Sequence, residues 1–352
     1  MRSVEARALH ISPHYTDGLR VLFVIPGAET GSSMIFAKRQ AATISQLPGI
    51  ITSVFFLESR TSLLSLVRAW RAIRHRIREF QPDLVHAQFG TMTAFFCAVS
   101  TSRPLVVTYF GSDLNPIRSG SRIRSLVGRV LSQLAALRSN AIICVSAQLR
   151  DRLWWRRDRV TVIPTPVDLQ RFYPRPRAEV RRDLGWPENE RVVLFNAGRD
   201  AVNKRLDLAR AAVAKAAELV GETRLLVLEG SVAPDAMPPL MNAADCLVLT
   251  SDFEGSPTVV PEALACNLPV VSVDVGDVRA RLQGVTHSQV VDRDPELLGT
   301  AIAVVLANRE RSNGSTIIAQ YSITTLAERI TSVYRDAREV QAGEEHIDSA
   351  EV

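Results

Sequence analysis

Short apolar runs of strand length recur along the whole chain, and longer amphipathic runs of helical period separate them. In the first half, the apolar runs lie at residues 19–25, 53–57, 83–87, 104–109, 141–146 and 160–164. The second half repeats this rhythm at residues 191–198, 224–230, 245–251, 268–274 and 288–292. Strands that alternate with helices predict α/β architecture, with parallel sheets covered on both faces. In such sheets, ligands bind beyond the carboxyl ends of the strands.

Two domains are expected, because 352 residues exceed one core of ordinary size. A charged stretch with three prolines at residues 174–187 separates the two series of strands and indicates a linker. We therefore expect two doubly wound domains with a cleft between them, at residues 1–170 and 171–335. The polar and acidic residues 341–352 are expected to be disordered.

Charge is distributed unevenly between the two halves. Residues 1–170 hold 22 Lys and Arg against 10 Asp and Glu, whereas the remainder holds 20 against 27. A basic half favours an anionic partner such as membrane lipid or a phosphorylated substrate. Nucleic acid is not expected as a partner, because no RNA- or DNA-reading motif accompanies the charge.

The N-terminus and the cysteines both favour the cytoplasm. Residues 1–18 lack the apolar core of a signal peptide, and no stretch approaches the roughly 18 apolar residues of a membrane-spanning helix. No C-x-x-C spacing relates Cys97, Cys144, Cys246 and Cys266, which are expected to be free thiols in a reducing compartment. We expect a cytoplasmic protein, with at most peripheral contact to the inner face of the cell membrane.

The stretch SDFEGSPTVVPEALACNLPVV, residues 251–271, places two glutamates around a loop that leads into a helix. A buried strand is expected to end near Ser251. Pro257 or Thr258 then begins the helix, because proline suits a first turn. Asn267 is expected to end it in the left-handed conformation, which asparagine tolerates better than most residues.

An anion site is expected at the start of this helix. Gly255 and Ser256 lie there, where free backbone N–H groups and the helix dipole favour negative charge. Glu254 lies on the loop side of this site, and Glu262 lies about one and a half turns into the helix. Carboxylates on both sides of a phosphate site suit a nucleotide sugar, which offers hydroxyls at both ends. The alternative is a helix-capping carboxylate and a solvated glutamate.

The residues around this loop resemble a known family. The stretch 241–278 resembles the donor-site signature of glycosyltransferase family 4, a large group of retaining enzymes with the two-domain GT-B fold. The family's pair of glutamates, E-x7-E, falls on Glu254 and Glu262. An upstream strand, basic loop and helix also resemble the family, and the Arg and Lys of that loop match Arg199 and Lys204.

Other parts of the chain extend the resemblance. Residues 162–174 are similar to the family's interdomain linker, and residues 141–153 resemble the last strand and helix of its acceptor domain. The similarity is greatest to members of exopolysaccharide and teichuronic-acid type. It implies Rossmann-like domains, with the acceptor bound by the first and the donor by the second.

The resemblance implies a retaining glycosyltransferase of hexosyl type. It would move a sugar from a nucleotide sugar to a glycan or lipid-linked acceptor in cell-surface polysaccharide synthesis. Catalysis would rest on Glu254, Arg199 and Lys204, the two cations offsetting the charge of the departing nucleoside diphosphate. No metal or other cofactor is therefore expected. The donor would be bound by Arg199, Lys204, Glu254, Gly255, Ser256, Pro257, Thr258 and Glu262.

Five residues of the first half are candidates for the acceptor side of the cleft. Phe110 stands where many family members have a histidine that contacts the donor sugar. Gly27 and Gly31 bend the first loop, where the family accommodates acceptor and phosphates. His86 ends an expected strand and is a candidate to face the cleft, and the resemblance implies that Asp113 faces it as well. Their alternatives are a structural histidine and a helix cap.

Several alternatives remain open from the sequence. Asp292 and Asp294 match a D-x-D metal motif, although Asp294 is better placed to cap the helix that Pro295 begins. One alternative function is that of a UDP-sugar 2-epimerase of the same fold, which would need further acid and base groups. Another is a non-catalytic nucleotide-sugar-binding subunit, which Phe110 favours.

A strongly basic helix is expected at residues 63–80. At helical spacing its apolar residues form one stripe, which would pack on the sheet. A functional interpretation adds docking on an anionic membrane surface, where each basic residue contributes about 1 kcal/mol. The basic residues concerned are Arg68, Arg71, Arg74, Arg76 and Arg78.

Overall fold

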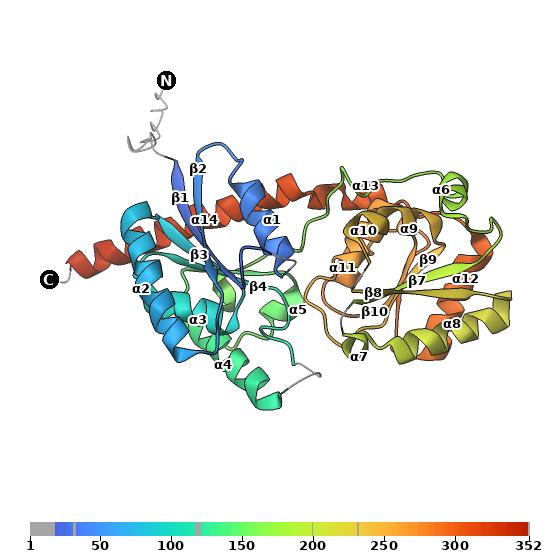
Figure 1. Cartoon of the computed structure of the whole chain (residues 1–352), viewed down its shortest axis with the longest axis horizontal. Helices are drawn as coiled ribbons and strands as arrows, with labels where there is room; N and C mark the ends of the chain where they lie inside the picture. Colours follow the sequence, from blue (N-terminus) through green and yellow to red (C-terminus); the bar gives the residue numbers. More distant parts are fainter. Residues whose placement is uncertain (1–17, 31–32, 117–120, 199, 231, 351–352) are drawn as a thin grey trace, which may run out of the picture.

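Two α/β domains lie side by side (Figure 1). The computed structural model describes residues 18–350, apart from residues 31–32, 117–120, 199 and 231. Each domain is built on a parallel sheet, in the order β2-β1-β3-β4-β5-β6 in the first domain and β11-β10-β9-β7-β8 in the second.

The elements of the first domain match the expected alternation, and each of its strands lies on an expected apolar run. The strands are β1 (Leu19–Pro26), β2 (Ile50–Leu57), β3 (Leu84–Gln88), β4 (Leu105–Tyr109), β5 (Ala141–Cys144) and β6 (Val160–Val162). The helices are α1 (Ile35–Ile44), α2 (Leu63–Phe80), α3 (Thr91–Ser100), α4 (Arg122–Arg138) and α5 (Ala147–Arg150), followed by the 3-10 turn η1 (Arg157–Arg159).

The second domain repeats the alternation with shorter strands. These are β7 (Val192–Gly198), β8 (Arg224–Glu229), β9 (Cys246–Leu249), β10 (Val270–Val273) and β11 (Gln289–Val291). The helices are α6 (Arg177–Leu184), α7 (Ala201–Lys204), α8 (Leu206–Val220), α9 (Met237–Ala243), α10 (Val259–Ala265), α11 (Val278–Arg281), α12 (Pro295–Asn308) and α13 (Gly314–Ile318). The 3-10 turns η2 (Pro234–Ala236) and η3 (Ala319–Tyr321) also belong here.

Both sheets have a topological switch point, where successive strands are added on opposite sides of one strand. In the first sheet, β2 and β3 lie on opposite sides of β1, and in the second sheet β8 and β9 lie on opposite sides of β7. Loops that leave the carboxyl ends of such strand pairs diverge and open a crevice. The loops after β1, β3, β7 and β9 are therefore the places where a ligand site is expected.

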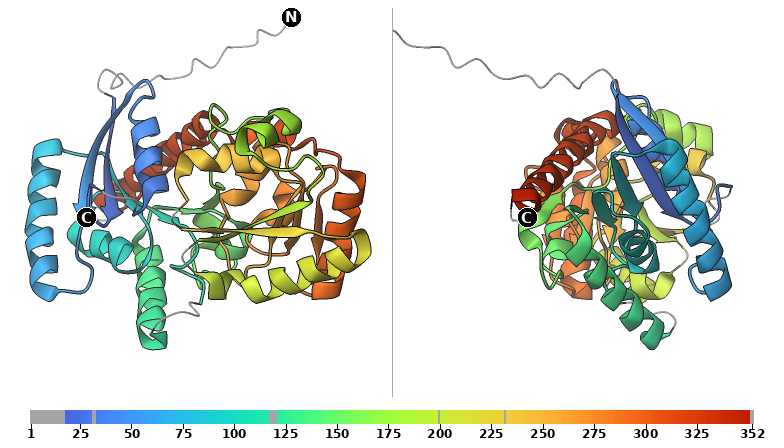
Figure 2. Two further views of the ribbon diagram at one scale, coloured as in Figure 1. Left: turned by 45° about the vertical axis from the view of Figure 1, so that its right-hand side comes forward. Right: turned by 90° about the vertical axis from the view of Figure 1, so that its left-hand side faces the viewer.

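The C-terminal helix α14 (Ile323–Ala350) returns from the second domain to the first (Figures 1 and 2). Its residues Leu326, Ile330 and Tyr334 are buried in one cluster with the first sheet. The expected domain boundary at residue 335 is therefore wrong, because α14 completes the first core. Helix α14 continues through residues 341–350, where a disordered tail was expected.

The cysteines occupy buried positions without disulfide bonds. All four are free thiols, as expected, and two of them, Cys144 and Cys246, lie on buried strands. Among the described residues, no helix combines the length and the apolar character that crossing a bilayer requires.

A buried arginine fastens the linker helix α6 to the second sheet. The Arg181 guanidinium donates to Asp245 Oδ2 at 2.8 Å and to the carbonyl oxygens of Glu188 and Glu190 at 2.6 and 2.8 Å. Asp245 Oδ2 also accepts the N–H of Val192, the first residue of β7, at 2.8 Å. One ion pair thus joins the linker to the starts of β7 and β9.

We expect Arg181→Met to destabilise the second domain by about 3 kcal/mol, because it removes one of the two arginine partners of the buried Asp245 carboxylate, the other being Arg177, and the donor to several carbonyls. Urea unfolding followed by hydrogen exchange of β7 and β9 isolates this domain. The matched control is Arg182→Met on the exposed face of the same helix, which should change stability by no more than about 0.5 kcal/mol. Equal losses in both variants would contradict this role of Arg181.

Candidate active site

The candidate site surrounds the loop that joins β9 to α10. Thr258 is the N-cap residue of α10, which confirms the expected helix start. The helix ends at Ala265, and Asn267 follows with φ of 56°, the left-handed conformation expected there. Most residues of α10 are buried in the second core, so the loop is held firmly at the carboxyl end of β9.

This loop touches the first domain backbone to backbone. A Cβ atom at Gly255 would lie 1.8 Å from the carbonyl oxygen of Phe110, so no side chain fits there. Gly111, next to Phe110, has φ of 147°, and a Cβ atom there would lie 3.1 Å from the Gly255 nitrogen. Asn115 Nδ2 donates to the carbonyl of Glu254 at 3.0 Å. The two domains therefore meet at the residues next to the first glutamate.

Glu254 is paired with a lysine of the same domain. Lys204 Nζ donates to Glu254 Oε1, and the two side chains are 21% and 13% exposed. Asn203 Nδ2 donates to the carbonyl oxygen of Phe253 at 3.0 Å, which fixes the end of α7 against the same loop. Lys204 and Glu254, two of the expected site residues, thus lie together. Arg199, the other expected cation, lies outside the described residues.

Glu262 has a perturbed acidity. Burial raises the pKa of the Glu262 carboxyl to about 7, although the charges of Arg171 and Arg39 oppose this shift. Arg171 belongs to the linker and Arg39 to α1 of the first domain. The carboxyl therefore exchanges its proton near neutral pH, next to basic residues of the linker and of the first domain.

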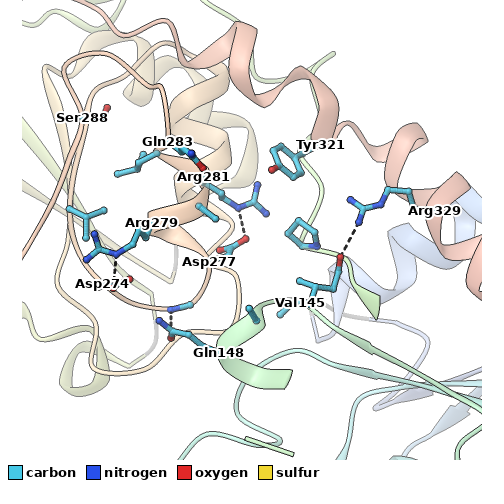
Figure 3. Close-up of a pocket in the computed structure, with 17 residues that line it drawn as sticks. Val145, Gln148, Asp274, Asp277, Arg279, Arg281, Gln283, Ser288, Tyr321 and Arg329 are labelled. Atoms are coloured by element: carbon cyan, nitrogen blue, oxygen red, sulfur yellow. Dashed lines mark hydrogen bonds and ion pairs between the residues drawn. The ribbon is translucent and has the colours of Figure 1, made fainter. Parts of the chain in front are cut away.

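The Ser256 hydroxyl belongs to a buried network. Ser256 Oγ donates to Asp277 Oδ2 at 2.8 Å and accepts from Arg281 Nη2 at 3.0 Å. Arg281 Nε also donates to Asp277 Oδ2, at 2.6 Å (Figure 3). The N–H of Thr165 in the linker donates to the same hydroxyl at 3.1 Å. The Ser256 side chain therefore ties the loop to α11 and to the linker, and the expected contact of the donor with the backbone N–H groups of this loop stays a prediction.

Two cavities lie at the domain junction. One, of about 470 Å³, is lined from the first domain by Phe36, Phe89 and Phe110 and from the second by Asn203 and Glu254. The rings of Phe36 and Phe110 are 4.6 Å apart, so they form an apolar wall of this cavity. The other, of about 920 Å³, shares none of these lining residues and is bordered by Gln148, Arg281 and Tyr321 (Figure 3).

His86 is a structural residue. It is fully buried, and its ring nitrogens lie 2.7 Å from Tyr334 Oη of α14 and 2.7 Å from Thr108 Oγ1 of β4. Burial lowers the pKa of His86 to about 3, so the ring is neutral. The expected contact with a ligand in the cleft is therefore wrong, and His86 instead helps to bind α14 to the first sheet.

Asp113 is structural as well. Its buried carboxylate accepts the N–H groups of Gly90, Phe110 and Gly111 at 3.1, 3.0 and 2.8 Å. It therefore shapes the loops after β3 and β4 and does not contact the cleft, contrary to one of the two expectations. Gly27 follows β1 with φ of 99°, as a bend there requires. Gly31 lies outside the described residues.

The D-x-D motif has a structural explanation. Asp294 Oδ1 accepts the N–H groups of Glu296 and Leu297 at 2.9 and 3.0 Å, which confirms the expected cap of α12. In the part of the chain that the structure describes, no three His, Cys, Asp or Glu side chains gather as metal ligands.

Sequence reasoning missed residues that hold the site together. Asn115, Asn203 and Thr165 contact the donor loop through side-chain hydrogen bonds, and nothing in their local sequence marks them. Asp277 and Arg281 carry one usable signal, because opposite charges at i and i+4 indicate a pair on a helix. Their burial depends on the tertiary fold.

Comparisons with known proteins assign both domains. The profile of Glycosyltransferase Family 4 matches residues 30–171, and that of Glycosyl transferases group 1 matches residues 183–308. The chain belongs to glycosyltransferase family 4. The two matched segments of this family 4 chain fall on the two domains, one on each.

Two relatives of this family 4 chain are named as glycosyltransferases. It is 29% identical over 246 residues to the putative teichuronic acid biosynthesis glycosyltransferase TuaC of Bacillus subtilis, across 64% of this chain and 61% of that protein. It is 34% identical over 186 residues to a D-inositol 3-phosphate glycosyltransferase of Geodermatophilus obscurus, across 43% and 41%. The matched segments thus span less than two thirds of these relatives.

Solved structures share the fold of this family 4 chain. Sucrose-phosphate synthase from Thermosynechococcus elongatus superposes with a TM-score of 0.69 at 16% identity, over 90% of this chain and 98% of that one. Alr3699/HepE from Anabaena, solved with UDP-glucose, gives 0.68 at 17% identity, over 90% and 99%. The expected GT-B fold is confirmed.

The acidity of Glu262 predicts a pH dependence of nucleotide-sugar binding. The carboxyl is neutral below its pKa of about 7 and ionised above it. An ionised carboxylate accepts hydroxyl hydrogen bonds more strongly, so affinity should rise as pH increases from 6 to 8. Calorimetric titration with a nucleotide sugar measures this, because its diesterified diphosphate does not titrate in that range. In Glu262→Gln, the rise should disappear. A rise of equal size in that variant would show that another group titrates.

Proposed function

We propose that this chain transfers a sugar from a nucleotide-sugar donor to a glycan or lipid-linked acceptor in cell-surface polysaccharide synthesis. The main supporting observation is the Lys204–Glu254 pair beside the interdomain cavity, with Glu262 on the helix that follows. Family membership adds support. So does the solved complex of Alr3699/HepE with UDP-glucose, a protein of the same fold.

The donor site would work through charge and hydrogen bonding. The bond between the anomeric carbon and the diphosphate oxygen breaks, and negative charge develops on the departing diphosphate. Lys204 has three N–H donors, so it can keep Glu254 and also donate to a phosphate oxygen. Arg199 is proposed as the second cation. Glu254 then accepts from sugar hydroxyls, and Glu262 accepts from the ribose diol.

The same step forms the new glycosidic bond. The acceptor hydroxyl bonds to the anomeric carbon, and its proton passes to the oxygen of the leaving phosphate. Attack from the face that the diphosphate leaves retains the anomeric configuration, as the family resemblance implies. Phe36 and Phe110 would exclude water from this side of the cavity. The anomeric configuration of the product, observed by NMR, tests this part.

The two alternatives make different demands on the site. An epimerase needs acid and base groups at the sugar, and the carboxylates among the described residues of the cavity are Asp200 and Glu254. Asp200 caps α7 through the N–H of Asn203, at 3.1 Å. His86 is buried away from the cavity. The geometry therefore favours transfer over epimerisation. A non-catalytic subunit would differ from a transferase and from an epimerase, because it would bind the nucleotide sugar without converting it.

Membrane docking through α2 is a further part of the proposal. Leu66, Ile73 and Ile77 pack in the first core, whereas the five arginines of the helix are exposed. The arginines therefore face solvent over much of the helix, and an anionic membrane surface complements them. A lipid-linked acceptor would be presented at such a surface.

Incubation with nucleotide sugars should release free nucleoside diphosphate, by transfer or by slow hydrolysis. Glu262→Ala should weaken nucleoside diphosphate binding about ten- to a hundredfold, the effect of losing a charge-assisted hydrogen bond. Glu254→Ala should spare that binding and lower the release. The assay follows the diphosphate, and calorimetry follows the binding.

Three outcomes would contradict the proposal. Tight binding of nucleotide sugars without release indicates a binding subunit, and a changed donor sugar indicates an epimerase. Release abolished by EDTA and restored by manganese or magnesium would return Asp292 and Asp294 to consideration as metal ligands. Activity in excess EDTA is expected instead, because Arg199 and Lys204 supply the positive charge.

Sedimentation with vesicles tests the membrane part. Binding should require anionic lipid and fall with salt, because surface charge attraction is screened by ions. Replacing Arg71 and Arg78 by glutamine should weaken it. The matched control replaces Arg182 and Arg210, two exposed arginines of the second domain. Equal binding to neutral vesicles, or equal losses in both double variants, would contradict docking through α2.

A further inference from the structure

A second pocket adjoins the candidate donor site within the first domain. It has a volume of about 480 Å³ and shares Arg60, Phe89 and Ser112 with the interdomain cavity that Glu254 lines. Its other walls come from the loop before α2 and from the first turns of α4. A molecule bound in this pocket can therefore extend past Phe89 to the donor.

Two arginines give this pocket a positive charge. Arg60 and Arg124 both line it, and no Asp or Glu does so among the described residues. Burial and the charge of Arg124 lower the pKa of Arg60, as is typical of two like charges that line one pocket. Two like charges without a carboxylate between them favour a bound anion. Hydroxyl donors surround them, from Thr61, Thr91, Ser112, Ser121 and Ser125.

Unusual backbone geometry occurs at the same wall. Phe89 has φ of 132° and Thr91 has φ of 53°, values that non-glycine residues rarely adopt. Between them, a Cβ atom at Gly90 would meet Tyr109 and Ser132 at 2.7 and 2.6 Å, so the turn is packed tightly. This turn places Phe89 in the wall of both cavities. Such strain is concentrated at ligand sites, because the surrounding structure must enforce it.

Exposed apolar side chains lie next to lining residues of this pocket in the sequence, and we call this group the apolar mouth. Leu63 and Leu64 in the first turn of α2 are 76% and 74% exposed, and Ile123 in the first turn of α4 is 76% exposed. Leu126 and Val127 of α4 are exposed as well. Both helices begin on the same side of the molecule (Figure 2). Apolar side chains beside an anion site match a ligand with a charged head and a hydrocarbon chain.

We propose that this pocket binds the phosphate or diphosphate group of a lipid-linked acceptor. The group lies between Arg60 and Arg124, and the hydrocarbon chain lies over Leu63, Leu64 and Ile123. The sugar of the acceptor then extends past Phe89 toward the donor. This inference rests on the proposed function and narrows its acceptor to a lipid phosphate.

Binding of farnesyl diphosphate, diphosphate and farnesol to the full chain tests the inference without any donor. Calorimetry should show farnesyl diphosphate bound at least about tenfold more tightly than either of the other two, because it uses both the arginines and the apolar mouth. The double variant Arg60→Gln, Arg124→Gln should lose about tenfold or more in affinity for both phosphates. The matched control Arg182→Gln, Arg210→Gln removes two exposed arginines of the second domain and should bind as the wild type.

A second double variant, Leu63→Asn, Ile123→Asn, should weaken farnesyl diphosphate alone. Diphosphate bound as tightly as farnesyl diphosphate would identify a soluble anionic ligand and overturn the lipid part. Wild-type binding in the Arg60 and Arg124 variant, or no binding in the wild type, would overturn the pocket itself. The proposed sugar transfer is judged separately by nucleoside diphosphate release, so failure of one does not imply failure of the other.

Discussion

The contact between Gly255 and the Phe110 carbonyl sets the geometry of the whole site. A Cβ atom at residue 255 would lie 1.8 Å from that oxygen, so only glycine permits the two domains to approach this closely. The contact places the loop after β9 against the loop after β4. Glu254 and the phenylalanine wall therefore border one cavity, and Lys204 is paired with Glu254 beside it. Larger residues at position 255 would hold the domains apart.

Hydrogen bonds join the interdomain linker to the loop between β9 and α10. Thr165 Oγ1 lies 2.8 Å from Ser256 Oγ, and Arg281 Nη2 donates to the carbonyl of Thr165 at 2.7 Å. A rotation of one domain on the other therefore acts directly on the residues next to Gly255. Helix α14 forms a second connection, through Tyr334 and His86. These two connections explain why polar side chains such as Thr165, Arg281 and His86 are buried.

Much of the fold was predictable, because buried parallel strands are nearly continuous apolar runs. The start and end of α10 followed from proline, threonine and asparagine chemistry at Pro257, Thr258 and Asn267.

The return of α14 was not predictable, since its amphipathic pattern does not say which sheet it covers. A family resemblance assigned both Lys204 and Glu254 to the donor site, but their ion pair was not expected. The structural roles of His86 and Asp113 depend on tertiary burial, which no local pattern encodes. The same holds for Arg60 and Arg124, which come together from segments 64 residues apart.

A crystal structure of the chain with a bound nucleoside diphosphate tests the central claim most directly. We expect the diphosphate within hydrogen-bond distance of Lys204 Nζ, beside Gly255, with the ribose hydroxyls on Glu262. The contradicting result is a nucleotide in the cavity of about 920 Å³ bordered by Gln148, Arg281 and Tyr321, with Lys204 and Glu262 free of contact.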